Sequence, residues 1–119
     1  MKKLFITAAA IAFTTAGVAF AGGNTSIVNQ GGWFNGQATT QVGHGNVAMT
    51  NQSNFGNTSI TGQLGAHNFA GTAQSGALNT SVTGQMGLGN QAGTIQSSVG
   101  NYSETNQAGV GNQSLTIQH

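Results

Sequence analysis

Acid–base or nucleophilic chemistry would depend on very few side chains in this sequence. Glu104 is the only carboxylate side chain, His44, His67 and His119 are the only histidines, and cysteine is absent. General acid–base catalysis requires such groups to lie within hydrogen-bonding distance of each other and of a substrate. The spacing of Glu104 and the histidines does not bring them together, so we expect no enzyme activity, no catalytic residues and no cofactor-binding residues.

A bound metal is the second kind of chemistry that the histidines could support. His44 and His67 fall in the same kind of glycine-containing segment in consecutive repeats, so they could share a metal loosely. Protein metal sites combine several nitrogen, sulfur or carboxylate ligands, and here neither a Cys nor a carboxylate completes the set. We therefore expect solvated turn histidines, a free His119 and no metal site.

The amino-terminal segment has the three regions of a secretory signal. Residues 1–3 are Met-Lys-Lys, residues 4–20 are predominantly apolar, and Ala19-Phe-Ala21 is a small-residue cleavage site. We expect residues 1–21 to be removed in export and residues 22–119 to form the mature repeat domain. A transmembrane anchor is the alternative, although the apolar run is short for a membrane span.

Export would leave a chain that is almost without charge. Both Lys residues lie in the signal and the sequence has no Arg, so Glu104 becomes the only charged side chain. A chain without cations cannot neutralise phosphates, which gives no support to nucleic-acid or anionic-membrane binding. With no disulfides, stability must come from backbone pairing and packing.

The strongest pattern in the sequence is carried by carboxamides, which donate and accept hydrogen bonds but do not titrate. Asn recurs every eleven residues, and Gln follows each Asn by six. A fixed period of this kind indicates a repeat architecture. The Asn residues are Asn24, Asn35, Asn46, Asn57, Asn68, Asn79, Asn90, Asn101 and Asn112, and the Gln residues are Gln30, Gln41, Gln52, Gln63, Gln74, Gln85, Gln96, Gln107 and Gln118.

Each segment from Asn to Gln, called an arc here, has the alternation of a β-strand. With Asn at position zero, the even positions hold Asn, Ser or Ala, Thr and Gln, and they face one side of the strand. Ala and Ser alternate from Ala48 to Ser103, so the true period is two arcs, or 22 residues. The sequence therefore predicts an all-β solenoid whose coils contain two strands. The threonines are Thr39, Thr50, Thr61, Thr72, Thr83, Thr94, Thr105 and Thr116, with Val28 in the first arc.

The even face is expected inside, although the odd face is the more apolar one. An inward odd face would bury Glu104 without a cation and would leave glycine-sized holes beside Ile residues. A uniform even face instead allows identical side chains to stack from coil to coil as Asn and Gln ladders, as in an amyloid core. The residues between arcs are usually x-Gly-x-Gly, where glycine permits positive φ. These turn glycines are Gly32, Gly43, Gly45, Gly65, Gly76, Gly87, Gly89, Gly109 and Gly111.

This repeat resembles the curlin repeat of curli, the extracellular amyloid fibres of bacteria. The matching residues of one coil are Ser81, Gln85, Gly87, Gly89, Asn90, Ala92 and Gln96, and the resemblance covers residues 24–118. It implies a β-solenoid that polymerises into a cell-surface pilus, or fimbrium, with roles in biofilm matrix and adhesion. It also implies a nucleator subunit, an outer-membrane secretion channel and a periplasmic holding chaperone as partners.

The chain departs from the major curlins in two respects. Only Gly22 and Gly23 lie between the expected cleavage site and Asn24, where major curlins carry a Gly-rich secretion segment. Nine arcs also make four and a half coils, so subunit junctions are expected to join unlike sheets or to be offset by half a coil. Uncapped strand edges predict growth by nucleated addition, and the thin core predicts a fresh monomer that orders only on joining a fibre.

Two other functions remain open at the level of sequence. One is a minor nucleator of the same fibre, although the last arc, Ser114 to His119, has no basic residue. The other is a soluble ice-binding β-solenoid, which would need the threonine row from Thr39 to Thr116 on the outside.

Overall fold

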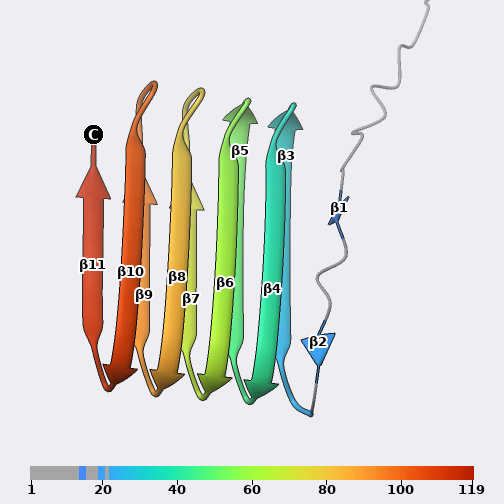
Figure 1. Ribbon diagram of the computed structural model, residues 1–119. Helices are drawn as coiled ribbons and strands as arrows, with labels where there is room; N and C mark the ends of the chain where they lie inside the picture. Colours follow the sequence, from blue (N-terminus) through green and yellow to red (C-terminus); the bar gives the residue numbers. More distant parts are fainter. Residues whose placement is uncertain (1–13, 16–18, 21) are drawn as a thin grey trace, which may run out of the picture.

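The computed structural model describes residues 14–15, 19–20 and 22–119 of the chain, and in this part every regular element is a β-strand (Figure 1). The strands are β1 (Thr14–Thr15), β2 (Ala19–Phe20), β3 (Thr25–Trp33), β4 (Gly36–His44), β5 (Val47–Phe55), β6 (Thr58–Ala66), β7 (Phe69–Gln74), β8 (Thr80–Leu88), β9 (Gln91–Gln96), β10 (Tyr102–Val110) and β11 (Gln113–Gln118).

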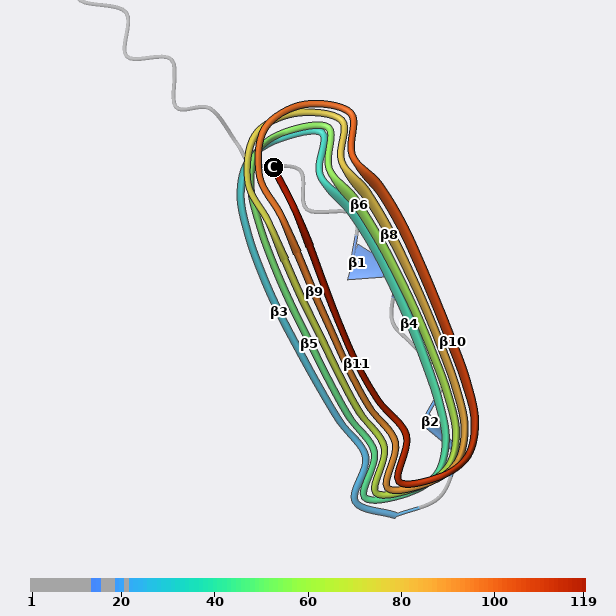
Figure 2. The same cartoon turned by 90° about the vertical axis from the view of Figure 1, so that its left-hand side faces the viewer.

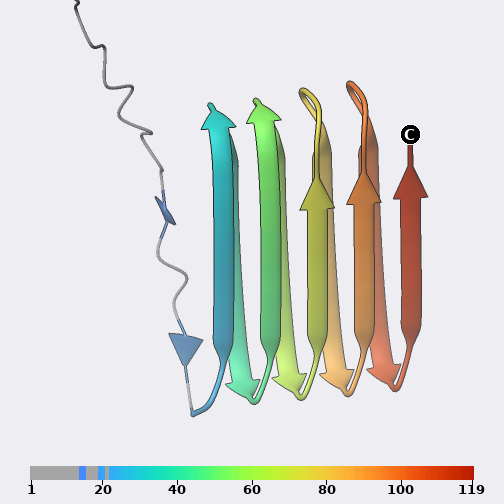
Figure 3. The same cartoon turned by 180° about the vertical axis from the view of Figure 1, so that it is seen from behind.

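The strands form two parallel sheets that face each other. Sheet A has β4, β6, β8 and β10 in that order, with β1 and β2 paired to the outer edge of β4, and sheet B has β3, β5, β7, β9 and β11. Each residue of β3–β11 pairs with the residue 22 positions away, as in Thr61↔Thr83 and Thr72↔Thr94. Viewed along the stack, successive coils superpose (Figure 2), and the two sheets lie on opposite faces (Figures 1 and 3). The predicted β-solenoid of two-strand, 22-residue coils is confirmed.

Burial alternates along the strands, with the even positions inside. In β6, Ser59, Thr61 and Gln63 are buried while Ile60 and Leu64 are exposed. Within residues 22–119 the buried apolar side chains are Ala48, Ala70 and Ala92 alone, and the other buried side chains are polar. Glu104 lies on the outer face, as the cost of burying an unpaired carboxylate requires. The interior is therefore thin and polar, and hydrogen bonds must hold it together.

The turns have the backbone that the glycine pattern predicts. All nine predicted turn glycines have positive φ, for example 119° at Gly65 and 66° at Gly89. At the first glycine of a turn the next coil also approaches closely, because a Cβ built at Gly65 would lie 2.0 Å from the carbonyl oxygen of Gly87. The residues that replace these glycines also take positive φ; they are Phe34, Asn54, His67, Leu78 and Ser98.

Strand length depends on the turn that follows. All sheet A strands from β4 to β10 contain nine residues and continue through the turn glycine, whereas β7, β9 and β11 contain six and end at Gln. Backbone pairing resumes after β7 and β9 through single bridges at Ala77, which pairs with Phe55 and Val99. The seven-residue arcs expected from the sequence are thus shorter than most of the observed strands.

Most of the expected signal segment, residues 1–21, lies outside the described residues. Its described parts, β1 and β2, pair in parallel with β4, with Thr14 opposite Gln37 and Ala19 opposite Gln41. No helix in the described part of the chain is long and apolar enough to cross a membrane.

Candidate assembly surface: amide ladders and open strand edges

The Gln side chains form two continuous hydrogen-bonded ladders, one against each sheet. Gln63 Nε2 donates to Gln85 Oε1 at 2.9 Å, and Gln85 Nε2 donates to Gln107 Oε1 at 2.8 Å. In every ladder residue except Gln30 the amide also donates to a backbone carbonyl of the opposite sheet, as in Gln85 Nε2 to Phe69 O at 2.9 Å. In the interior coils both amide hydrogens and the amide oxygen are thus used, which compensates for burying the group.

The Asn side chains brace the start of each strand against the neighbouring coils. The backbone N–H of Asn90 donates to Asn68 Oδ1 at 3.1 Å. The Asn90 amide in turn donates to Met86 O within its own coil and to Gly109 O in the following coil, both at 3.0 Å. The same pattern recurs at other arcs, including Asn46, Asn57 and Asn79. Each Asn therefore ties a strand start, the preceding turn and the adjacent coil together.

Hydroxyl groups link the two sheets between these ladders. Thr50 Oγ1 lies 3.4 Å from Ser59 Oγ, and Thr72 Oγ1 lies 3.4 Å from Ser81 Oγ. The equivalent groups one coil further on are Thr94 Oγ1 and Ser103 Oγ, which are buried without a hydrogen-bond partner. A threonine of sheet B thus faces a serine of sheet A in successive coils.

Most of the predicted ladder residues are buried, and those at the two ends of the stack are more exposed. The buried members are Asn35, Asn46, Asn57, Asn68, Asn79, Asn90, Gln41, Gln52, Gln63, Gln74, Gln85, Gln96, Gln107, Thr39, Thr50, Thr61, Thr72, Thr83, Thr94 and Thr105. The less buried members are Asn24, Gln30, Asn101, Asn112, Thr116 and Gln118. Gln37, at the Ser or Ala position, is also buried and donates to the Thr39 hydroxyl. The ends differ because the end coils lack a covering coil on one side.

The Gln ladders have a direction, so the two ends of the stack differ chemically. Every Gln-to-Gln hydrogen bond runs from an amide nitrogen to the amide oxygen of the next coil towards the carboxyl terminus. At that end, the Gln107 and Gln118 amides donate only to the carbonyls of Gln91 and Tyr102. At the other end, Gln30 and Gln41 donate to the next coil. One end therefore offers amide hydrogens and the other offers amide oxygens, which makes the two ends complementary.

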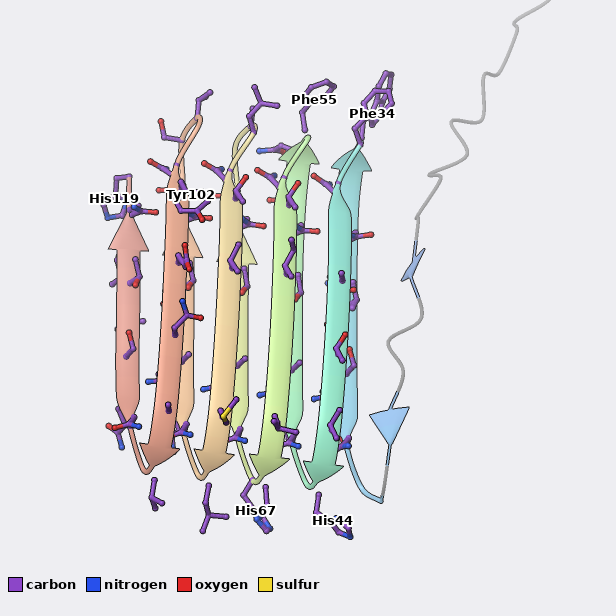
Figure 4. The ribbon with its side chains drawn as sticks, in the orientation of Figure 1. Phe34, His44, Phe55, His67, Tyr102 and His119 are labelled. Carbon is purple, nitrogen blue, oxygen red and sulfur yellow. The ribbon has the colours of Figure 1, made fainter. Side chains whose placement is uncertain are left out.

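The residues that could do acid–base or metal chemistry remain on the surface. His44 and His67 are neighbours in one row of turns (Figure 4). Phe34 and Phe55 lie in the opposite row of turns, where their rings pack edge to face with centroids 5.5 Å apart. Residues 22–119 contain no group of three or more His, Cys, Asp or Glu able to hold a metal. His119 Nδ1 lies 2.9 Å from Ser97 Oγ, so His119 is not free.

Glu104 is engaged on the outer face of β10 rather than with a histidine. It accepts hydrogen bonds from Tyr102 Oη at 3.0 Å and from Asn106 Nδ2 at 2.8 Å. The hydrogen bond to the Glu104 carboxylate, reinforced by its negative charge, raises the pKa of Tyr102 above the ordinary value of 10.0. The Glu104 carboxylate is thus occupied by a phenol and an amide of its own strand.

Three glycines with positive φ were not among the predicted turn glycines. Gly23, Gly56 and Gly100 have φ values of 79°, 65° and 74°, and each directly precedes the Asn of the next arc, as Gly45 does. In the turns of Gly56 and Gly100 the first glycine is replaced by Asn54 and Ser98 respectively. The eleven-residue spacing assigns all three to the same position as Gly45.

No protein-family model and no curated protein matches the chain.

Proposed function

We propose that this chain is a structural subunit of extracellular, curli-type amyloid fibres, which grow by stacking of open strand edges. The observation that carries the proposal is the complementary pair of solenoid ends. The edges of β10 and β11 are open at one end and the edge of β3 is open at the other, where β4 is paired with β1 and β2 of the expected signal segment. The amide donors of Gln107 and Gln118 at the first end match the acceptors of Gln30 and Gln41 at the second. An open parallel edge is a template for pairing with another chain.

The energetics favour addition to an existing fibre over formation of the first contact. Two edge strands provide up to about fourteen backbone hydrogen bonds, each contributing on the order of 0.5–1.5 kcal/mol. Association costs roughly 4–15 kcal/mol, so the first contact is near balance, while a formed fibre end presents an ordered template. Nucleated growth with a lag is the expected behaviour.

The outer surface is consistent with an assembly role. It carries exposed apolar side chains such as Ile60, Leu64 and Met86, and Glu104 is its only acidic side chain in residues 22–119. Such a surface has few charges to oppose aggregation. The threonine row needed for ice binding lies inside, since Thr50 and Thr83 are 3% and 2% exposed, and this favours the fibre over the ice-binding alternative.

Location and partners follow from the sequence resemblance. We place the mature domain, residues 22–119, in a cell-surface pilus or fimbrium of a bacterium. A second copy of the chain is the main partner. A nucleator subunit, a secretion channel and a holding chaperone are the partners that curli-type assembly would require.

Fibre growth tests the proposal directly. Residues 22–119, which contain β3–β11 entire, would be released from denaturant beside the full chain and followed by thioflavin fluorescence and fibre diffraction. We expect a lag that seeds abolish and reflections near ~4.7 Å and ~10 Å. A folded β-rich monomer that never forms fibres would refute the proposal.

A single substitution at the growing edge sharpens this test. Leu115 is exposed on β11, and alternate residues of a parallel strand direct their backbone groups to opposite sides, so its N–H faces the open edge. Leu115→Pro removes that donor. It should stop growth when added to seeds, whereas Leu115→Ala should elongate normally. Equal elongation by both variants would count against assembly through this edge.

A further inference from the structure

Two subunits cannot pair both of their terminal strand edges if sheet A is continued by sheet A and sheet B by sheet B. Nine strands, β3–β11, alternate between the sheets, beginning and ending in sheet B. If β3 of one subunit paired with β11 of another, the β10 and β4 edges of sheet A would remain separated by the space of one strand. Only one of the two terminal edges would then be satisfied.

Turning the second subunit by half a turn about the solenoid axis removes this gap. β3 then pairs with β10 and β4 with β11, so that both edges are covered. β3 and β10 each contain nine residues that start one position after Asn. We propose, building on the proposed fibre function, that a second copy of this chain docks in this half-turned arrangement and that every subunit junction joins sheet A to sheet B.

The half-turned arrangement continues both Gln ladders. The Gln107 amide would reach Gln30 of the partner subunit, and the Gln118 amide would reach Gln41 of the partner subunit, repeating contacts that are 2.7–2.9 Å within the chain. Stacking without rotation would give Gln118 a partner but leave Gln107 facing the gap. The ladder direction also requires head-to-tail order.

The row of hydroxyl pairs across the sheets supports the same arrangement. Thr50 and Thr72 of sheet B each face a serine nine residues further on, in sheet A. Thr116 is the corresponding residue of β11, but sheet A has no strand beyond β10 to face it. The half-turned junction places Ser26 of the partner subunit there. Ser26 is a serine where the interior sheet B strands have Ala48, Ala70 and Ala92.

The junction competes with the segment that precedes the solenoid. β1 and β2 pair with the edge of β4 that would receive β11. Growth at this end therefore requires β1 and β2 to leave the edge, which removal of residues 1–21 would accomplish. A chain that keeps this segment should add to fibres more slowly than residues 22–119.

Paired cysteines on the outer face distinguish the two junctions. Asn29, Asn106 and Ile117 are exposed and occupy the same position of β3, β10 and β11. Residues on β3 and β10 of one chain are about 17 Å apart along the axis, at ~4.8 Å per coil, so a disulfide between them must join two subunits. The test uses N29C/N106C, with N29C/I117C as the matched variant and the single variants as controls, in the full chain and in residues 22–119.

We expect oxidised N29C/N106C fibres to contain disulfide-linked oligomers and N29C/I117C fibres to contain no more than the single variants. The fibre map should show a rise of about 22 Å per subunit with a half turn, whereas stacking without rotation gives about 24 Å and no rotation. Linkage of N29C/I117C instead, or of neither pair in grown fibres, would overturn the junction and leave the fibre function standing. Failure of the wild-type chain to form fibres would overturn both.

A glycine at the edge provides an independent test. A Cβ at Gly87 would lie 1.9 Å from the Gly109 carbonyl oxygen. A Cβ at Gly109, in contrast, would meet no backbone atom within 4 Å, because no coil covers it on that side. The half-turned junction brings Gly32 of the partner subunit against Gly109 in the same way. Gly109→Ala should slow elongation about tenfold or more relative to Gly89→Ala, which has positive φ but open space. Equal elongation rates would contradict the junction.

Discussion

Replacing one interior ladder amide by an apolar side chain of similar size should destabilise the solenoid severely. Gln85 is 3% exposed and lies in the middle of sheet A. Its amide donates to Phe69 O and to Gln107 Oε1, and its oxygen accepts from Gln63 Nε2, at 2.8–2.9 Å. Gln85→Leu removes all three hydrogen bonds. The Gln63 amide then loses an acceptor, and the Phe69 carbonyl and the Gln107 amide oxygen each lose a donor inside the protein.

The expected loss can be worked from these three groups. Each buried unsatisfied group costs about 1–3 kcal/mol, or roughly 3–9 kcal/mol in total, and apolar burial of leucine recovers about 2 kcal/mol. We therefore expect the free energy of unfolding to fall by roughly 4 kcal/mol.

The assay is a guanidinium titration of the β-structure followed by circular dichroism. Gln91→Leu is the matched control, because Gln91 is exposed on the outer face of β9, and it should change the unfolding free energy by less than about 0.5 kcal/mol. Equal stability of Gln85→Leu and Gln91→Leu would show that the ladders do not hold the coils together.

Three further outcomes follow from single residues. Gly87→Ala should unfold at lower denaturant than Gly89→Ala, because a Cβ at Gly87 would lie 1.9 Å from the Gly109 carbonyl oxygen, whereas a Cβ at Gly89 would meet nothing within 4 Å; equal midpoints would contradict the close approach. Thr94→Val should leave stability unchanged or raise it by about 1 kcal/mol, since the Thr94 hydroxyl is buried without a partner; a large loss in the same titration would show that the hydroxyl is bonded. Tyr102 is the only tyrosine, so its titration can be followed without interference. Because the pKa of Tyr102 is raised, the stabilising hydrogen bond to Glu104 is fully present below the ordinary tyrosine pKa and is lost as the pH rises through the raised pKa. Absorbance titration should therefore give a lower tyrosine pKa in Glu104→Gln, and an unchanged pKa would refute the coupling.

The inward direction of the polar face was predictable because one side chain decided it. Hydrophobicity alone favours the odd face inside, but that would bury Glu104, and the structure instead places Glu104 outside, bonded to Tyr102 and Asn106. The eleven-residue spacing then assigned each Asn and Gln to its row. A strict repeat makes such inference strong, because an error at one position would recur in every coil.

Other features depended on distances that no residue pattern contains. The hydroxyl pair Thr72 and Ser81 meets at 3.4 Å, whereas the equivalent Thr94 and Ser103 remain without partners, although both pairs have the same residue types and spacing. Strand ends were similarly unpredictable, since pairing continues through Gly65 but stops at Gln74.

The polar core and the open ends have linked energetic consequences. An apolar core would gain stability from collapse within one chain, but this interior gains it from hydrogen bonds that are complete only when a coil has neighbours on both sides. Gln107 and Gln118 bond to carbonyls within their own chain, and nothing in residues 22–119 lies beyond them to accept the second amide hydrogen. Adding coils to a single chain would leave two such ends unchanged. Joining chains end to end would cover two exposed ends at every junction, so a subunit in the interior of a long fibre would have no exposed end. The proposed fibre would therefore stabilise each subunit, and the proposed half-turned junction is the arrangement that would complete both sheets at once.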